Sequence, residues 1–119
     1  MKQISESEKQ IMDIIWRNER ALTTAEILKQ LPKNKSWKQT TVGTFLSRLT
    51  KKNIIKSTRV GRAYHYEACI SEEQYRLMET KHFINDVHKG SVSGFLQTLA
   101  DSGDLTKSDI KALMEKLRE

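Results

Sequence analysis

The stretch of sequence that decides the fold is Ser36-Trp-Lys-Gln-Thr-Thr-Val-Gly-Thr-Phe-Leu-Ser-Arg-Leu-Thr-Lys-Lys52. Four of its apolar residues are spaced at i, i+3, i+4 and i+7, namely Val42, Phe45, Leu46 and Leu49. This spacing puts them on one face of a helix, which we expect to face the core. Ser36 and Gln39 match the capping-box pattern, so the helix is expected to begin after Ser36 and to run to Lys52 or Asn53.

The opposite face of this helix carries hydroxyl, amide and basic side chains. No Asp or Glu occurs from residue 28 to residue 66. Glutamine can bridge the edge of adenine, threonine can bond to a base or pack against it, and Arg or Lys late in the helix suits a phosphate. We interpret this face as a DNA-reading surface rather than an ordinary solvated face. Its expected contacts are Lys38, Gln39, Thr40, Thr41, Thr44, Ser47, Arg48, Lys51 and Lys52.

Further elements are expected on both sides of this helix. Capping boxes begin at Ser5, Thr23 and Ser71, and Thr106 caps a last helix. In chain order we expect helices over residues 6–18 and 24–31, the helix just described, strands over 54–57 and 63–68, and helices over 71–89, 92–101 and 106–117. Three helices followed by a hairpin are the plan of a winged helix-turn-helix. The expected fold class is therefore mainly α with a small β-hairpin, followed by a helical region.

The hairpin turn, expected over residues 58–62, is basic. Gly61 is free to take the positive φ that a tight turn needs. Arg59, Gly61 and Arg62 are therefore predicted to form a wing tip that rests on phosphates or enters the minor groove. The alternative is a merely soluble turn.

Charge and length separate two parts of the chain. The 119 residues carry a net charge of +6, with +8 in residues 1–70 and −2 in residues 71–119. We expect a DNA-binding domain over 1–70 and a helical dimerisation region over 71–119. No apolar run approaches the roughly 18 residues of a membrane span, and the polar N-terminus lacks a signal-peptide pattern. A cytoplasmic protein that does not associate with a membrane is expected.

Residues capable of other chemistry give little support for an enzyme. Trp16 and Trp37 are interpreted as core residues rather than stacking platforms. The single cysteine, Cys69, is interpreted as a small packed residue. His82 and Asp86 are one helical turn apart, but two ligands make a weak metal site. No phosphate-binding or dinucleotide-binding fingerprint occurs, so neither a catalytic residue, a metal nor a cofactor is expected.

The last 49 residues carry more apolar helix face than they are expected to bury alone. We expect them to share a core with a second copy, because a two-fold dimer also places two recognition helices on a palindrome. Packing onto the front domain is the alternative. The expected dimerisation residues are Tyr75, Met78, Phe83, Ile84, Val87, Val92, Phe95, Leu96, Leu99, Ile110, Leu113, Met114 and Leu117.

An ordered set of short motifs resembles the penicillinase and methicillin-resistance repressors, which are grouped with copper-responsive repressors. The matching stretches are Ile4-Ser5-Glu6, Met12-Asp13-Ile14-Ile15-Trp16, Trp37 to Thr41 with Thr44, Arg48-Leu49, Lys51-Lys52, Gly61-Arg62 with Tyr64 and Tyr66, Phe83-Ile84-Asn85 with Val87, Lys89-Gly90, and Asp104-Leu105. The resemblance spans nearly the whole chain without large gaps.

This resemblance implies a homodimeric repressor on a palindromic operator, most often of β-lactam resistance genes. It further implies a sensor-linked protease that releases DNA by cutting the dimerisation region, at a bond matching Thr98 and Leu99. The family's Asn and Phe are absent at these two positions. Thr40 and Gly43 also depart from residues common in relatives, so the operator sequence is expected to differ.

Two other functions remain open from the sequence. The C-terminal helices would bind another protein if the winged helix were only a scaffold, an alternative that the acid-free helix face disfavours. A repressor of this family answering a different signal, such as a metal, is the second alternative. Copper sensing through paired Cys-x-Cys motifs is not expected, because Cys69 is the only cysteine.

Overall fold

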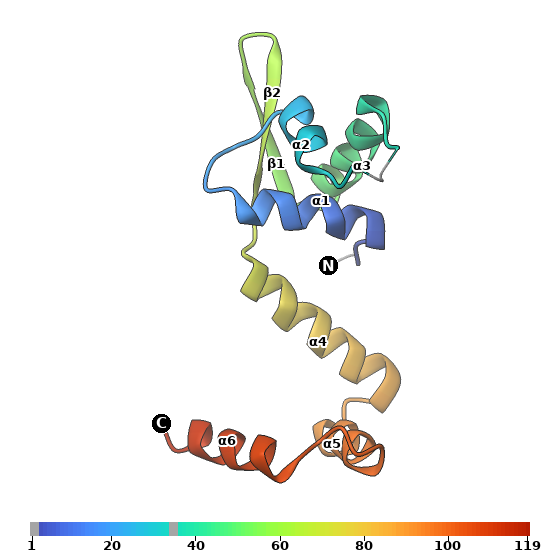
Figure 1. The fold of residues 1–119 in the computed structure, drawn as a ribbon, viewed down its shortest axis with the longest axis vertical. Coiled ribbons are helices and arrows are strands. Elements are labelled where there is room, and N and C mark those ends of the chain that lie inside the picture. The colour runs from blue at the N-terminus through green and yellow to red at the C-terminus, as the bar shows by residue number, and fades with distance from the viewer. Residues whose placement is uncertain (1–2, 34–35) are drawn as a thin grey trace. The chain divides into compact units, whose positions relative to one another are not determined.

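A computed structural model describes residues 3–33 and 36–119 (Figure 1). Its elements are α1 (Glu6–Arg17), α2 (Thr24–Gln30), α3 (Gln39–Lys51), β1 (Ile55–Val60), β2 (Ala63–Ala68), α4 (Glu72–His88), α5 (Val92–Asp101) and α6 (Lys107–Leu117). This order confirms the predicted fold class, three helices and a hairpin followed by a helical region. No helix of the described ranges combines the length and apolar character that a membrane crossing requires.

Capping boxes start most of the helices, as the sequence predicts. At α1 the Glu8 backbone N–H donates to Ser5 Oγ at 3.1 Å, and the Ser5 N–H donates to Glu8 Oε1 at 2.8 Å. The same reciprocal pairs form at Thr23, Ser71 and Thr106. Each box satisfies N–H groups that the first helical turn leaves without partners.

The capping box predicted at Ser36 is wrong. Helix α3 begins at Gln39, after Lys38, and has no side-chain cap. The backbone at Lys38 is extended, with φ −90° and ψ 165°. Trp37 packs against the Phe45 ring with 5.1 Å between centroids and lies partly buried beside the core. We attribute the late helix start to this packing, because it holds the chain before Gln39 extended.

The hydrophobic core lies under the first three helices and the base of the hairpin. Its buried residues are Ile11, Met12, Ile14, Ile15, Leu22, Ile27, Leu31, Val42, Leu46, Leu49, Ile54 and Ile55. Trp16 and Trp37 pack against this cluster, which agrees with their interpretation as packing residues. Leu22, between α1 and α2, forms an isolated bridge with Tyr66, and their N–H and carbonyl groups bond reciprocally at 2.9 and 2.8 Å. This bridge ties the hairpin to the segment between α1 and α2.

The hairpin turn is shorter than predicted. Strands β1 and β2 are antiparallel from the pair Ile55 and Ala68 to the pair Val60 and Ala63, so only residues 61–62 form the turn. The expected turn residues 58–60 belong to β1 instead. A positive φ of 65° at Gly61 but not at Arg62 is the geometry of a type II′ turn, which suits the right-handed twist of the strands.

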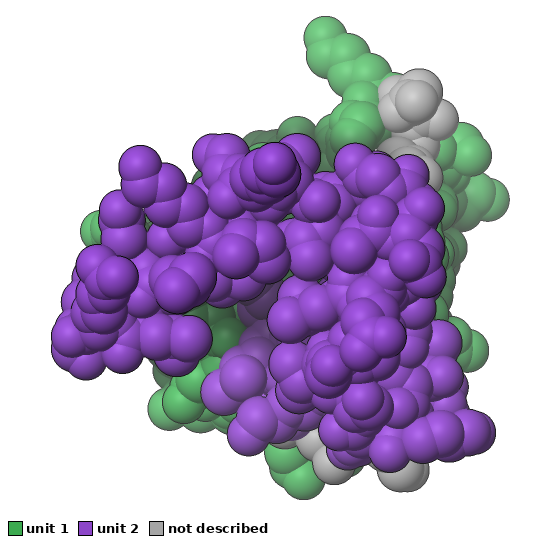
Figure 2. Space-filling view, turned by 90° about the horizontal axis from the view of Figure 1, so that it is seen from below, with its two compact units in different colours: residues 1–75 green, residues 76–119 purple. Residues whose placement is uncertain are grey.

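The chain divides into two compact units, Met1–Tyr75 and Arg76–Glu119, coloured separately in Figure 2. This division falls within α4, five residues beyond the expected boundary. In the second unit, the Phe83 and Phe95 rings meet edge to face at 6.0 Å. None of the residues in α4, α5 and α6 is buried. Ile84, Phe95, Leu96 and Leu99 are partly buried within this unit. Other large apolar side chains of the three helices are exposed, namely Leu77, Phe83, Val87, Val92, Ile110, Leu113, Met114 and Leu117.

Candidate nucleic-acid interface

Helix α3 presents one buried face and one open polar face. Val42, Leu46 and Leu49 are fully buried, as predicted, whereas Phe45 is half-buried. Of the predicted contact residues on this helix and its N-cap, most are exposed and Thr41 is partly exposed. The exposed ones are Lys38, Gln39, Thr40, Thr44, Ser47, Arg48 and Lys51. The structure thus gathers on one helix the side chains that the sequence assigned to base and phosphate contacts.

Local contacts orient several of these side chains. The Thr44 hydroxyl donates to the carbonyl oxygen of Thr40 at 3.0 Å, so its methyl group and lone pairs remain for an outside partner. The Arg48 guanidinium lies 5.7 Å above the Phe45 ring, a cation–π contact that holds the cation at the helix surface. A Cβ at Gly43 would meet nothing within 4 Å, so the surface beside it is open.

Lys52, predicted to contact DNA, is engaged inside the protein. Its Nζ lies 2.8 Å from Glu8 Oε1 and 3.0 Å from Oε2, and also donates to the carbonyl oxygen of Gln3 at 2.9 Å. Its side chain is 19% exposed. We leave it out of the contact set because a charge with three internal acceptors is poorly available to a phosphate.

The hairpin tip presents a small basic and apolar surface. Arg59 lies 5.8 Å over the ring of Tyr64 and donates through Nε to the carbonyl oxygen of Gly61 at 3.2 Å. Arg62 is exposed in the turn. Val60, which the sequence analysis did not single out, is 60% exposed beside them. The sequence signal that could have identified Val60 is its position, as a β-branched residue directly before the turn glycine. The Tyr64 ring that lies against Arg59 is itself 50% exposed.

Ion pairs elsewhere leave the positive charge of α3 and the tip uncompensated. Four of the six acidic residues in 1–70 are already paired with a Lys or Arg. These pairs are Asp13 with Lys9, Glu26 with Arg20, Glu8 with Lys52 and Glu67 with Lys56. The remaining cations of α3 and the hairpin tip therefore set the local potential, which attracts a polyanion.

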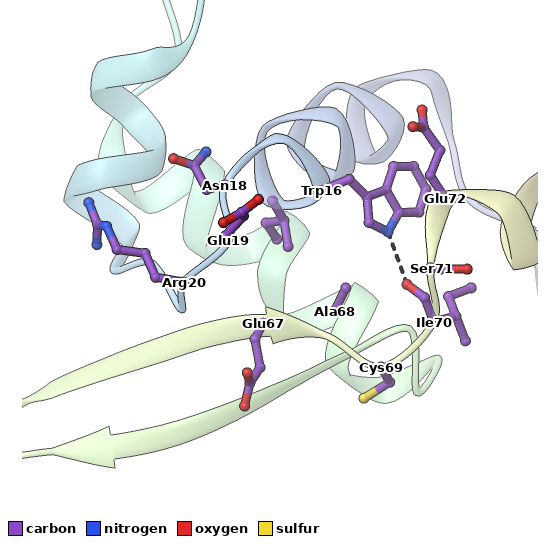
Figure 3. A pocket seen from close by; sticks show the side chains of 11 residues that line it. Trp16, Asn18, Glu19, Arg20, Glu67, Ala68, Cys69, Ile70, Ser71 and Glu72 are labelled. Atoms are coloured by element: carbon purple, nitrogen blue, oxygen red, sulfur yellow. Dashed lines mark hydrogen bonds between the residues drawn. The ribbon is translucent and has the colours of Figure 1, made fainter.

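An open cavity of about 460 Å³ in the first unit is a poorer site for nucleic acid (Figure 3). Glu19, Glu67 and Glu72 line it with one cation, Arg20, which is paired with Glu26. Acidic groups therefore outnumber basic ones in its lining, which disfavours phosphate. Cys69 is exposed at its wall, so its interpretation as a packed residue is wrong. The chain has left β2 at this point, and the Cys69 N–H donates to the carbonyl oxygen of Ile54 at 2.8 Å. That bond fixes the backbone without burying the thiol.

Comparison with known proteins identifies relatives of this chain in sequence and in structure. The sequence model of the family described as penicillinase repressor matches residues 4–119. The penicillinase repressor of Bacillus licheniformis is 29% identical over 117 residues, which are 98% of this chain and 91% of that protein.

Two solved structures resemble part of this chain. One is the solution structure of the DNA-binding domain of the repressor BlaI, with a TM-score of 0.54 and 36% identity over 61% of this chain and 88% of that one. The other is Bacillus licheniformis BlaI in monomeric form in complex with the blaP half-operator, with a TM-score of 0.52 and 35% identity over 62% of this chain and 89% of that one.

Proposed function

The chain belongs to the penicillinase repressor family, and from this premise we propose that it is a homodimeric repressor of β-lactam resistance genes that binds a palindromic operator. The observation that carries the proposal is the open, acid-free face of α3, together with the pairing of four of the six acidic residues in residues 1–70. As a DNA-binding protein it would act in the cytoplasm.

Helix α3 would lie in the major groove with its first turn against the bases. Gln39 and Thr41 stand in that turn, where an amide and a hydroxyl can bond to base edges. The N–H groups of Thr41 and Val42 donate to the carbonyl oxygen of Lys38. Because α3 has no side-chain cap, the N–H groups of Gln39 and Thr40 before them would be available to a phosphate. Arg48 and Lys51, in the last turns, suit phosphates farther along the groove.

The hairpin tip would make a second contact with DNA. Arg62 offers a charge that fits a phosphate or a narrow minor groove, and Val60 an apolar surface for the sugar edge. The reciprocal bonds between Leu22 and Tyr66 support this role, since they hold the hairpin against the helical part of the same unit. Arg59 would serve at the tip as well, with its guanidinium already placed by Tyr64 and Gly61.

The C-terminal helices would form the dimer. Large apolar side chains are exposed in α4, α5 and α6, including Phe83, Val87, Val92, Ile110, Leu113, Met114 and Leu117. Covering such a surface with a second copy removes it from water and sets two α3 helices at a fixed spacing. Specificity for a palindrome follows from that spacing. The rival function, docking of an unrelated protein onto these helices, would leave the α3 surface without a use.

Proteolysis in the dimerisation region would release the operator. The bond between Thr98 and Leu99 lies inside α5, where the Thr98 hydroxyl donates to the carbonyl oxygen of Gly94 at 3.1 Å. A sensor-linked protease would have to unwind this turn before cutting. The cut would separate α6 and its apolar residues from α4, so the dimer would lose part of its interface.

Selection of bound sequences from a random DNA duplex pool, at 50 and 200 mM salt, tests the proposal. We expect a palindrome to be recovered and the affinity for it to fall by roughly 10³–10⁵ between the two salt concentrations, if about 6–10 phosphates are neutralised per dimer. Salt-sensitive binding without a motif would contradict a specific repressor. Recovery of a single half-site would contradict the homodimer but not sequence-specific DNA binding.

A further inference from the structure

Glu8 and Lys52 form an ion pair inside the DNA-binding unit. Glu8 is 2% exposed and is the buried charged side chain among the described residues. Lys52 Nζ contacts both of its carboxylate oxygens, at 2.8 and 3.0 Å, and the carbonyl oxygen of Gln3 at 2.9 Å. The ammonium thus uses its three donors on three acceptors of the N-terminal segment.

This pair connects the beginning of α1 to the end of α3. Glu8 lies in the first turn of α1, and its Oε1 also accepts the N–H of Ser5 at 2.8 Å. Lys52 is the C-cap of α3, and its own N–H donates to the carbonyl oxygen of Arg48 at 3.1 Å. Glu8 and Lys52 are 44 positions apart, so the contact is tertiary and not a consequence of local helix geometry.

Stability alone is a weak explanation for such a pair. Removing two charges from water costs free energy that their attraction roughly offsets, so apolar side chains of similar size often serve as well. An apolar pair, however, makes no directional hydrogen bonds. Val42, Leu46 and Leu49 bury the middle of α3 through contacts without directional bonds, whereas the Lys52 ammonium makes three hydrogen bonds that restrict where the end of α3 can lie.

We propose that Lys52 is a positioning residue for DNA recognition, which acts by fixing through Glu8 the angle at which α3 is presented. This inference rests on the proposed function. Helix α3 has 13 residues, and at about 1.5 Å per residue it is about 20 Å long, so a tilt of about 5° at one end moves the other by about 1.7 Å. Gln39 and Thr41 stand at that other end. Base contacts need positions accurate to about 0.5 Å, so discrimination between sequences is lost before the fold is.

The test compares operator and scrambled duplexes for the wild type and five variants, by fluorescence anisotropy on the full chain, with the operator obtained by selection. Lys52→Met and Glu8→Gln both break the pair, but Glu8→Gln makes the protein more positive. If only electrostatic attraction mattered, Glu8→Gln would bind DNA more tightly. If the pair positions α3, both variants should bind the operator more weakly. We expect about tenfold loss on the operator, the size of one base contact, and less than about twofold change on the scrambled duplex.

Two further variants provide matched controls. Lys52→Arg keeps the cation in a larger, planar head group and is expected to retain more discrimination than Lys52→Met but less than the wild type. Lys51→Met removes the neighbouring exposed charge, and is expected to weaken both duplexes alike and reduce the salt slope by about one, as loss of a phosphate contact should. Equal losses on both duplexes for Lys52→Met, with the same reduced slope, would overturn the proposal and return Lys52 to the phosphate contacts.

A double variant separates positioning from stability. Glu8→Leu with Lys52→Met replaces the pair by apolar side chains and is expected to unfold in urea near the wild-type midpoint while still discriminating poorly. If the double variant folds and discriminates between the duplexes as well as the wild type, the proposal is overturned. This outcome decides the question even if one of the single variants fails to fold. Failure of the proposed function would appear separately, as wild-type protein that binds no specific duplex at all.

Discussion

The indole Nε1 of Trp16, near the end of α1, donates a hydrogen bond of 3.0 Å to the carbonyl oxygen of Ile70, 54 positions later (Figure 3). The Trp16 ring also meets the Tyr75 ring at 5.3 Å between centroids. Ile70 lies between the last strand and α4. The bond therefore fastens the point where the chain leaves the hairpin to the first helix.

Replacing Trp16 by Phe keeps an aromatic ring and removes this donor. We expect the free energy of unfolding to fall by about 1 kcal/mol from the lost bond, with some further loss from the smaller ring. Urea unfolding followed by circular dichroism measures it. In the wild type, the indole N–H proton of Trp16 should exchange slowly with solvent in NMR spectra, and fast exchange would contradict the bond.

Replacing each of two glycines by alanine should change the free energy of unfolding in opposite directions. Gly61 has φ of 65°, which an L side chain adopts at a cost, so Gly61→Ala should destabilise the protein by about 1–2 kcal/mol. Gly43 lies inside α3 with free space around a Cβ, so Gly43→Ala should stabilise it by about 1 kcal/mol. Both values come from urea midpoints without DNA. Equal effects of the two substitutions would refute the turn geometry.

The Glu26 carboxylate should titrate far below an ordinary glutamate. A hydrogen bond from Arg20, followed by the backbone bond at Thr23, lowers its pKa from 4.5 to about 2. Since the folded pKa is the lower one, the stabilisation is present above about pH 4.5 and is lost as the pH falls toward 2. NMR titration of the side-chain carbonyl carbon measures this. Arg20→Ala should raise the Glu26 pKa, and an unchanged value would rule out the ion pair.

The helix starts could be predicted from sequence because their causes are local. Ser5, Thr23, Ser71 and Thr106 each bond to a residue three positions away, and that spacing is visible in the chain. Ser36 has the same spacing, but the ring contact of Trp37 with Phe45 competes with it. A local pattern therefore predicts a cap only where no tertiary contact opposes it.

Most of the candidate interface was likewise predictable, because α3 carries its own periodicity. Lys52 was not, since nothing in the sequence shows that Glu8 lies beside it. The same holds for Leu22 and Tyr66, whose pairing joins distant segments. Cys69 was misjudged because burial after the end of a strand depends on how the chain continues.

Base readers and phosphate anchors should respond differently to mutation. Arg62→Ala should weaken binding to all duplexes by a similar factor and reduce the salt slope by about one. Gln39→Ala and Thr41→Ala should instead change base preference at one position, by about 1–3 kcal/mol per lost contact, and leave the salt slope unchanged. Anisotropy titrations on single-base variants of the operator distinguish the two. If all three variants lost affinity uniformly, the division into readers and anchors would be wrong.

The exposed apolar face of α6 predicts which substitutions should prevent dimer formation. Leu113 is 46% exposed on the face that also holds Ile110, Met114 and Leu117, whereas the helical spacing places Ala112 on the opposite face. Leu113→Glu should place a charge in the dimer interface and yield monomers in sedimentation velocity, while Ala112→Glu, with the same charge change, should remain dimeric. Because two linked sites gain about 10²–10⁴ in apparent affinity, the Leu113 variant should bind the full palindrome no better than one half-site. A dimeric Leu113→Glu protein with full operator affinity would mean that α6 lies outside the interface.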